Sequence, residues 1–231
     1  MDSFDTANTH ETTLELETAR AWYRGQIIPK PVLAVMDAET ARLAESGLTT
    51  HALKAGDAVP DFILPDAQGQ LVRSHSLLRN GPLVIAFYRG GWCPYCNLHL
   101  RGFQRVLPQL KELGAQIVAI SPQLPDNSLS TQEKNDLAFP VLSDVGNKVA
   151  RQFGIVFELS DKLLEFYRQF GHSLDEANGE GGKKELPVPA TFLVDRKGVI
   201  RQAHVDVDYT RRVDPDDIIV ALKNIQNKNT I

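Results

Sequence analysis

Residues 83–96 read Leu-Val-Ile-Ala-Phe-Tyr-Arg-Gly-Gly-Trp-Cys-Pro-Tyr-Cys, and this segment is the most informative about the fold. Its opening side chains are continuously apolar, which is typical of a strand buried on both faces of a sheet. Gly90 and Gly91 end that strand, and the apolar residues after Cys96 recur at helical spacing as far as Gly114. We therefore expect both cysteines in the first turn of a helix that directly follows a buried strand.

The spacing of Cys93 and Cys96 suits redox chemistry. Two residues three apart on a helix have Cβ atoms about 5–6 Å apart, which is close to what a disulfide requires. The unpaired N–H groups and the positive dipole of a helix start lower a thiol pKa from about 8.5 toward about 3.5–7.5. Pro94 is tolerated there because its missing N–H would have no partner. The pattern predicts a nucleophilic and a resolving sulfur side by side.

Two other interpretations of the pair fit less well. A zinc site usually takes four ligands from two paired motifs, but the sequence has no second Cys-x-x-Cys. His99, one turn beyond Cys96, is the nearby candidate for a further ligand, and we interpret it as a helix-face histidine rather than a proton shuttle. Two inert core cysteines would rarely stand between a strand and a helix. We expect no metal and no other cofactor.

Composition narrows the class of protein. The 231 residues carry 25 basic and 29 acidic side chains, for a net charge of −4, so the chain lacks the positive footprint of a nucleic-acid or membrane-surface binder. The first twenty residues are polar and acidic, unlike a secretory signal, and no apolar run approaches the length of a membrane span. Two cysteines do not make a secreted disulfide framework. We expect a cytoplasmic enzyme without nucleic-acid or membrane partners.

The patterning divides the chain into a helical extension at residues 1–53 and a main domain at residues 54–231. Strands alternate with helices in the main domain and a hairpin follows, which predicts an α/β fold with a mixed central sheet flanked by helices. The strands are predicted at 83–88, 117–120, 190–194 and 199–204. The helices are predicted from the two cysteines up to Gly114 and at 144–153, 158–170 and 215–226.

Pro189 precedes the strand predicted at 190–194. A proline there can be a simple entry residue of the strand. We favour a cis peptide bond before it, because cis prolines occur where a chain turns sharply. In that interpretation Pro189 presents backbone hydrogen-bonding groups to whatever docks against the cysteines.

These features resemble the thioredoxin superfamily and, more narrowly, its alkyl hydroperoxide reductase/thiol-specific antioxidant family, over about residues 54–225. The resemblance rests on GDAVPDFILPDAQG, LVIAFYRGGWCPYC, FPVLSDVGNKVARQFGI and VPATFLVDRKGVIRQAHV, in that order. It implies a thioredoxin-like fold and peroxiredoxin-like thiol chemistry. The extension at 1–53 and an insertion at about 158–185 lie outside the common core and suggest a homodimer.

At the site itself the resemblance divides. The family pattern has a proline where this chain has Arg89, a threonine where it has Cys93, and an arginine where it has Pro189; only the peroxidatic cysteine, at Cys96, is kept. Thioredoxin-like disulfide oxidoreductases are similar in having W-C-x-x-C and a proline ahead of the late strand. In that pattern Cys93 attacks and Cys96 resolves.

Three further residues complete the predicted site. Arg89 either supplies the guanidinium of the family arginine, which is absent at Pro189, or is a surface residue at the end of a strand. Trp92 either packs beside the disulfide or contacts the substrate, and Tyr95 lies between the cysteines and shapes the site.

The resemblance implies a thiol-dependent peroxidase for hydrogen peroxide or organic hydroperoxides. Cys96 would form a sulfenic acid, Cys93 would condense with it, and thioredoxin or a glutathione-type thiol would reduce the disulfide. One alternative is a thiol–disulfide oxidoreductase with Cys93 as nucleophile and little peroxidase activity. Another is a redox-responsive or metal-holding interaction module without catalysis.

Overall fold

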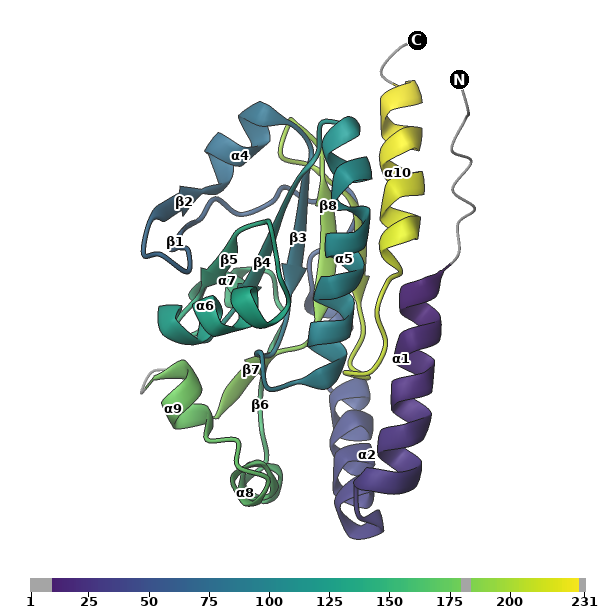
Figure 1. The fold of residues 1–231 in the computed structure, drawn as a ribbon, viewed down its shortest axis with the longest axis vertical. Coiled ribbons are helices and arrows are strands. Elements are labelled where there is room, and N and C mark those ends of the chain that lie inside the picture. The colour runs from purple at the N-terminus through teal and green to yellow at the C-terminus, as the bar shows by residue number, and fades with distance from the viewer. Residues whose placement is uncertain (1–9, 180–183, 229–231) are drawn as a thin grey trace.

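The computed structural model describes residues 10–179 and 184–228 and shows a mixed sheet flanked by helices (Figure 1). The predicted fold class is confirmed. The strand order is β5-β4-β3-β8-β9, with β3 parallel to β4 and antiparallel to β8. The strands are β3 (Leu83–Phe87), β4 (Gln116–Ser121), β5 (Val141–Ser143), β8 (Ala190–Val194) and β9 (Ile200–Val205).

The central strand β3 is buried along its whole length, as its continuous apolar run predicts. Val84 and Ala86 face a core shared with α5 (Pro94–Glu112), whereas Ile85 and Phe87 face the core on the other side of the sheet. Because β3 is held between two cores, the turn that follows it has a fixed position. That turn carries the cysteines.

Shorter elements surround this centre. The strands are β1 (Ile63–Pro65), β2 (Leu71–Arg73), β6 (Val156–Glu158) and β7 (Glu185–Pro187). The helices are α1 (Glu11–Trp22), the π-helix η1 (Tyr23–Ile27), α2 (Lys30–Glu45), α3 (Leu48–His51), α4 (Ser74–Asn80), α6 (Pro125–Lys134), α7 (Lys148–Gln152), α8 (Asp161–Gln169), α9 (Leu174–Asn178) and α10 (Pro215–Lys228). Within the described ranges no helix has the length and apolar character that crossing a bilayer requires.

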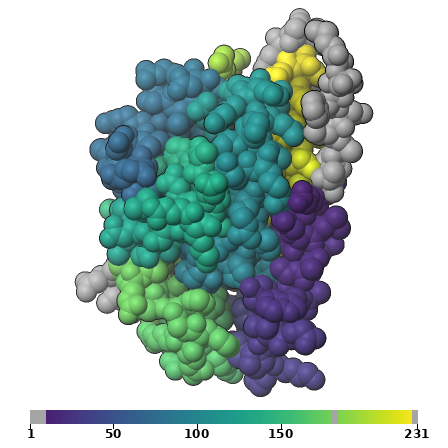
Figure 2. Space-filling model, viewed as in Figure 1, coloured from purple at the N-terminus to yellow at the C-terminus, as the bar shows by residue number. Residues whose placement is uncertain are grey.

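The extension packs onto the main domain. A Cβ on Gly102 of α5 would collide with Thr12 of α1, so the two helices are in close contact. Arg105 strengthens this contact by donating hydrogen bonds to Thr12 Oγ1 and Glu15 Oε2, both at 2.9 Å. Figure 2 shows the extension reaching the insertion at one end of the molecule, where α2 contacts α8. Residues 1–9 of the extension and 180–183 of the insertion lie outside the described residues.

Two local predictions are wrong. The bond before Pro189 is trans, as are the other peptide bonds of the described chain. Val188 N–H donates to Ile155 O at 2.8 Å and β8 begins at Ala190, so the chain runs from β7 into β8 without the sharp turn that favours a cis bond. The helix predicted at 144–153 starts only at Lys148. Asp144 lies in the loop before it, and its carboxylate accepts the N–H groups of Val149 and Ala150 in the first turn.

Candidate active site

The start of α5 holds both sulfurs. Cys93 is the residue before the first helical turn, Pro94 opens that turn, and Cys96 lies within it. Both are free cysteines, and their exposed fractions are 0% and 1%. The predicted position of the pair is therefore observed, but the sulfurs lie beneath the surface.

Two glycines bring the chain from β3 into this position. Gly90 has φ +154°, and a Cβ on it would collide with the indole of Trp92. A Cβ on Gly91 would collide with Thr131 of α6. The N–H of Gly91 donates to Gln123 Oε1 at 2.7 Å, which fixes the turn from the side. The glycines thus serve the tight turn and the close approach that the sequence indicates.

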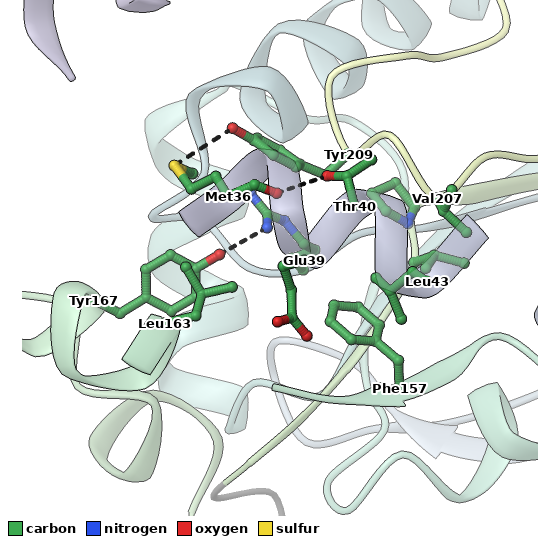
Figure 3. Close-up of a pocket in the computed structure, with 12 residues that line it drawn as sticks. Met36, Glu39, Thr40, Leu43, Phe157, Leu163, Tyr167, Val207 and Tyr209 are labelled. Carbon is green, nitrogen blue, oxygen red and sulfur yellow. Dashed lines mark hydrogen bonds between the residues drawn. The ribbon is translucent and has the colours of Figure 1, made fainter. Parts of the chain in front are cut away.

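Arg89 is buried, with an exposed fraction of 4%, so its interpretation as a surface residue is wrong. Its Nη2 lies 3.4 Å from Cys93 Sγ, and its Nη1 donates to the hydroxyl of Tyr167 at 2.9 Å. The guanidinium carbon lies 5.0 Å from the ring centre of Trp92 and 4.2 Å from that of Tyr209. Figure 3 shows Tyr167 and Tyr209 on different elements, and the dashed line at the hydroxyl of Tyr167 marks the hydrogen bond that it accepts from Arg89.

A second arginine contacts the other sulfur. Arg212 Nη2 lies 3.6 Å from Cys96 Sγ. Its Nη1 donates to the carbonyl oxygens of Tyr209 and Arg211, both at 2.6 Å, which fixes the side chain on the segment between β9 and α10. Each cysteine therefore has its own guanidinium.

These contacts shift the pKa values of the two thiols in opposite directions. Burial by itself raises the pKa of Cys93, but a hydrogen bond from Cys96 and the charges of Arg89 and Arg212 outweigh burial and hold that pKa well below its usual value. Burial, together with the neighbouring Cys93 thiolate, holds the pKa of Cys96 well above its usual value. The directions of these two pKa shifts favour a thiolate on Cys93 and a proton on Cys96.

Aromatic rings cover the pair. Trp92 lies 5.2 Å from Tyr167 and 5.6 Å from His172, between ring centres. Tyr95 contacts Tyr209 at 5.7 Å between ring centres, and burial raises its pKa to about 12, so its hydroxyl stays protonated. The rings exclude water from the sulfurs, which strengthens the attraction between the thiolate and its guanidinium groups.

His99 takes no part in this arrangement. Its Nε2 donates to the carbonyl of Val213 at 3.0 Å, and its ring lies 4.8 Å from that of Phe103. Burial and the charge of Arg212 hold its pKa well below the usual value, so the ring is neutral. Among the described residues there is no group of His, Cys, Asp and Glu arranged to hold a metal ion.

Most of the residues singled out in the sequence lie together. Cys93, Cys96, Arg89, Trp92 and Tyr95 surround the start of α5. Pro189 lines a small cavity together with Arg89 and Tyr209.

Three residues of the site were not predicted. Tyr167 belongs to the insertion, and Tyr209 and Arg212 belong to the segment before α10. Tyr167 follows Leu163 at helical spacing, a pattern that could have placed it on the buried face of α8. Nothing local marks Arg212, which lies 116 residues from Cys96 along the chain.

Comparisons with known proteins find relatives for most of this chain. The model of the AhpC/TSA family matches residues 55–203. The chain is 28% identical to the chloroplastic peroxiredoxin Q of Triticum aestivum over 208 residues, which are 90% of this chain and 82% of that protein. It is 33% identical to peroxiredoxin Bcp of Escherichia coli over 108 residues, which are 47% of this chain and 69% of that protein. The crystal structure of peroxidoxin BcpB from Mycobacterium tuberculosis superposes with a TM-score of 0.59 at 26% identity, covering 75% of this chain and 98% of that one.

Proposed function

The chain belongs to the AhpC/TSA family, and from that premise we propose that it is a thiol-dependent peroxidase that works through Cys93 and Cys96. The observation that carries this proposal is a buried pair of free cysteines with a guanidinium against each sulfur. A peroxidase needs a thiolate at neutral pH, and the arginines stabilise that charge where water is absent.

We infer the order of the two cysteines from the directions of their pKa shifts. Cys93 is the thiolate, so it attacks the terminal oxygen of a hydroperoxide ROOH; the O–O bond breaks, and a sulfenic acid and RO⁻ are formed. RO⁻ takes up a proton from the solvent and leaves as ROH. The thiol of Cys96 then condenses with the sulfenic acid, which forms the disulfide and releases water. This order reverses the one that the family pattern implies.

Arg89 substitutes for the hydrogen-bond donors of the family threonine and arginine, whose positions are Cys93 and Pro189 in this chain. Its Nη2 holds the thiolate and its Nη1 holds Tyr167, while its Nε is buried and has no partner among the described residues. Such an N–H can donate to the oxygen that leaves as RO⁻. One preorganised donor of this kind contributes about 2.7–4 kcal/mol of transition-state stabilisation.

The cycle closes by thiol exchange. Two equivalents of a thiol, from thioredoxin or a glutathione-type reductant, reduce the Cys93–Cys96 disulfide and are themselves oxidised to a disulfide. We also propose a cytoplasmic location, since so few cysteines suit a reducing compartment. Homodimer formation remains a proposal that rests on the helical extension and the insertion.

Stopped-flow Trp fluorescence of the reduced protein mixed with hydroperoxide tests this function, because Trp92 adjoins Cys93. We expect a fast change that depends on peroxide concentration, is abolished in Cys93→Ser, and stops at the sulfenic acid in Cys96→Ser. Mass spectrometry of each variant identifies the oxidised sulfur. A reaction no faster than that of free cysteine would refute the peroxidase, and sulfenic acid on Cys96 of the Cys93→Ser variant would reverse the order.

A further inference from the structure

A cavity of about 220 Å³ lies beside the sulfurs, between the extension and the insertion. Its inner end is formed by Arg89, Trp92 and Tyr95, the residues that cover Cys93. At its outer end Ile27 and Phe170 are 47% and 48% exposed, so the cavity opens to the surface there. It is a passage from solvent to the guanidinium that holds the thiolate.

The wall of the cavity is almost entirely apolar. Between the two ends it is lined by Ile28, Val32, Met36, Leu163 and Phe166. Arg89 is the charged side chain in the lining, and its buried Nε has no partner among the described residues. Trp92 Nε1 and the hydroxyl of Tyr95, at the same inner end, are likewise buried without a partner among the described residues. An apolar pocket with a few polar donors gathered at one end is the arrangement that binds an apolar molecule with a polar head.

Much of this wall is specific to the chain. Ile27, Ile28, Val32 and Met36 belong to η1, α2 and the link between them, and all precede residue 55, where the match to the family model begins. Leu163 and Phe166 lie on α8, in the insertion. The cavity is therefore formed where two additions to the common core meet, and the core alone would leave the covering of Cys93 open.

We propose that this cavity binds the apolar substituent of an organic hydroperoxide, and that the chain consequently selects such substrates over hydrogen peroxide. The proposal rests on the peroxidase function above. The peroxide group of the substrate lies between Cys93 and the Nε of Arg89, and its alkyl or aryl group occupies the space between α2 and α8. A volume of about 220 Å³ suits a compact branched or aromatic group, because typical drug-sized sites measure about 300–1,000 Å³.

The selection has a simple physical basis. An apolar group that leaves water for this wall contributes binding energy in proportion to the area that is buried. Hydrogen peroxide has no such group and receives none of that energy. A substitution in the wall must therefore change kcat/KM for the two substrates by different factors. A residue with only a structural role would change both values by the same factor.

The test fills the cavity without touching the sulfurs. Ile28→Trp places a bulky ring in a half-buried wall position, and Val220→Trp makes a comparable change on the exposed side of α10, away from the cavity. For both variants and the unmodified chain, kcat/KM is measured with cumene hydroperoxide and with hydrogen peroxide. Binding of 2-phenyl-2-propanol, the alcohol product, to the reduced proteins is measured by calorimetry.

We expect Ile28→Trp to lower kcat/KM for cumene hydroperoxide by about tenfold or more and to change that for hydrogen peroxide by less than about twofold. The alcohol should bind the unmodified chain and Val220→Trp but not Ile28→Trp. An equal effect on both peroxides, or alcohol binding that survives in Ile28→Trp, would overturn the assignment of the cavity. If the alcohol binds as expected but no protein consumes either peroxide, the peroxidase function is wrong and the apolar site stands.

Discussion

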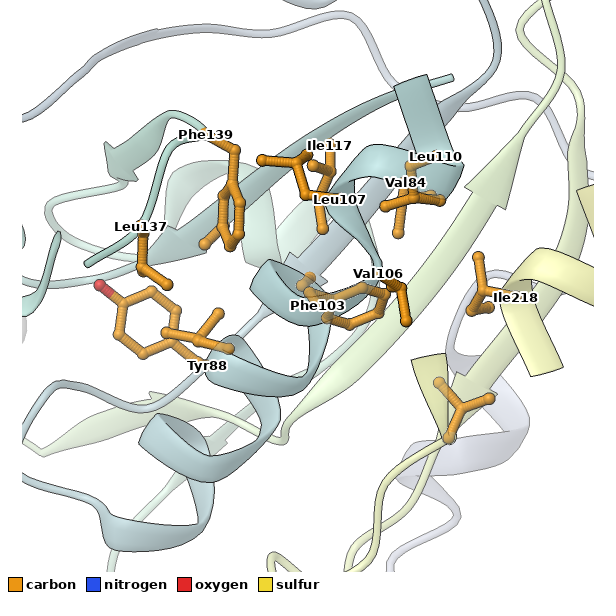
Figure 4. Close-up of a cluster of buried hydrophobic side chains, with 14 of the residues drawn as sticks. Val84, Tyr88, Phe103, Val106, Leu107, Leu110, Ile117, Leu137, Phe139 and Ile218 are labelled. Carbon is orange, nitrogen blue, oxygen red and sulfur yellow. The ribbon is translucent and has the colours of Figure 1, made fainter. Parts of the chain in front are cut away.

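Along α5, the apolar side packs Phe103, Leu107 and Leu110 into the sheet beside Val84 and Ile117, as Figure 4 shows. At the amino-terminal end of the same helix, two sulfurs contact guanidinium groups that come from outside the helix. The packed region consists of α5 and the neighbouring strands on the face of the sheet that α5 covers. The second gathers Arg89 from the strand end, Tyr167 from the insertion and Arg212 from the segment before α10.

The comparison shows that different residues position the cysteines and control their reactivity. The packed core determines where the cysteines lie, because β3 and α5 are fixed against each other by buried side chains. The groups around the sulfurs determine which thiol is charged and what reaches it. Substitutions in the core should therefore change stability more than chemistry, and substitutions around the sulfurs should do the reverse.

The largest effect is expected from Phe103→Ala. Phe103 is fully buried, and removing a buried phenyl group costs about 3–5 kcal/mol in the free energy of unfolding. Urea denaturation measures this loss. In the fraction that remains folded, peroxide reactivity per folded molecule should stay within about twofold of the original. A large change in reactivity without a loss of stability would contradict the division between the two regions.

Next in size is Arg89→Leu. The variant leaves the Cys93 thiolate without its nearest positive charge and removes the Nε donor, so we expect kcat/KM for hydroperoxide to fall about 10²–10³-fold. The rate should also require higher pH, because the pKa of Cys93 rises. Arg196→Leu, a substitution at an exposed arginine, is the matched control. Equal rates for the two variants would show that Arg89 is only structural.

The sequence predicts the packed region well and the site only in part. Continuous apolar runs and helical spacing are local signals, and they located β3, β4, β8 and α5. Arg89 could not be assigned from the sequence, since the same residue at a strand end can point to solvent or inward. Arg212 and Tyr209 are brought to the sulfurs by tertiary packing over a long chain distance, which no local pattern reports.

Arg212→Leu should have a smaller effect. Its guanidinium lies 3.6 Å from the sulfur of Cys96, which carries the proton, so it stabilises the Cys93 thiolate from a greater distance. We expect about a tenfold decrease in the rate of the first oxidation step, which corresponds to about 1.4 kcal/mol. Stopped-flow fluorescence measures that rate. A loss as large as that of Arg89→Leu would mean that the roles of the two arginines are exchanged.

The smallest effect is expected from Tyr167→Phe. This change removes the hydroxyl that accepts a hydrogen bond from Arg89 but keeps the ring against Trp92. A single hydrogen bond of this kind contributes about 0.5–1.5 kcal/mol, so peroxide reduction should slow by about 2- to 12-fold. Tyr23→Phe, on the extension, is the control. If Tyr167→Phe has no effect, the insertion does not position Arg89.

The proposed mechanism requires the thiolate on Cys93 rather than on Cys96. A pH titration of thiolate ultraviolet absorbance in the reduced protein tests it, with Cys93→Ser and Cys96→Ser alongside. Because the pKa of Cys93 is lowered, its thiolate persists at neutral pH and is lost only as the pH falls well below the usual range of a cysteine. We predict that the unmodified chain shows this acidic transition and that Cys93→Ser lacks it. An acidic transition that survives in Cys93→Ser and disappears in Cys96→Ser would place the thiolate on Cys96.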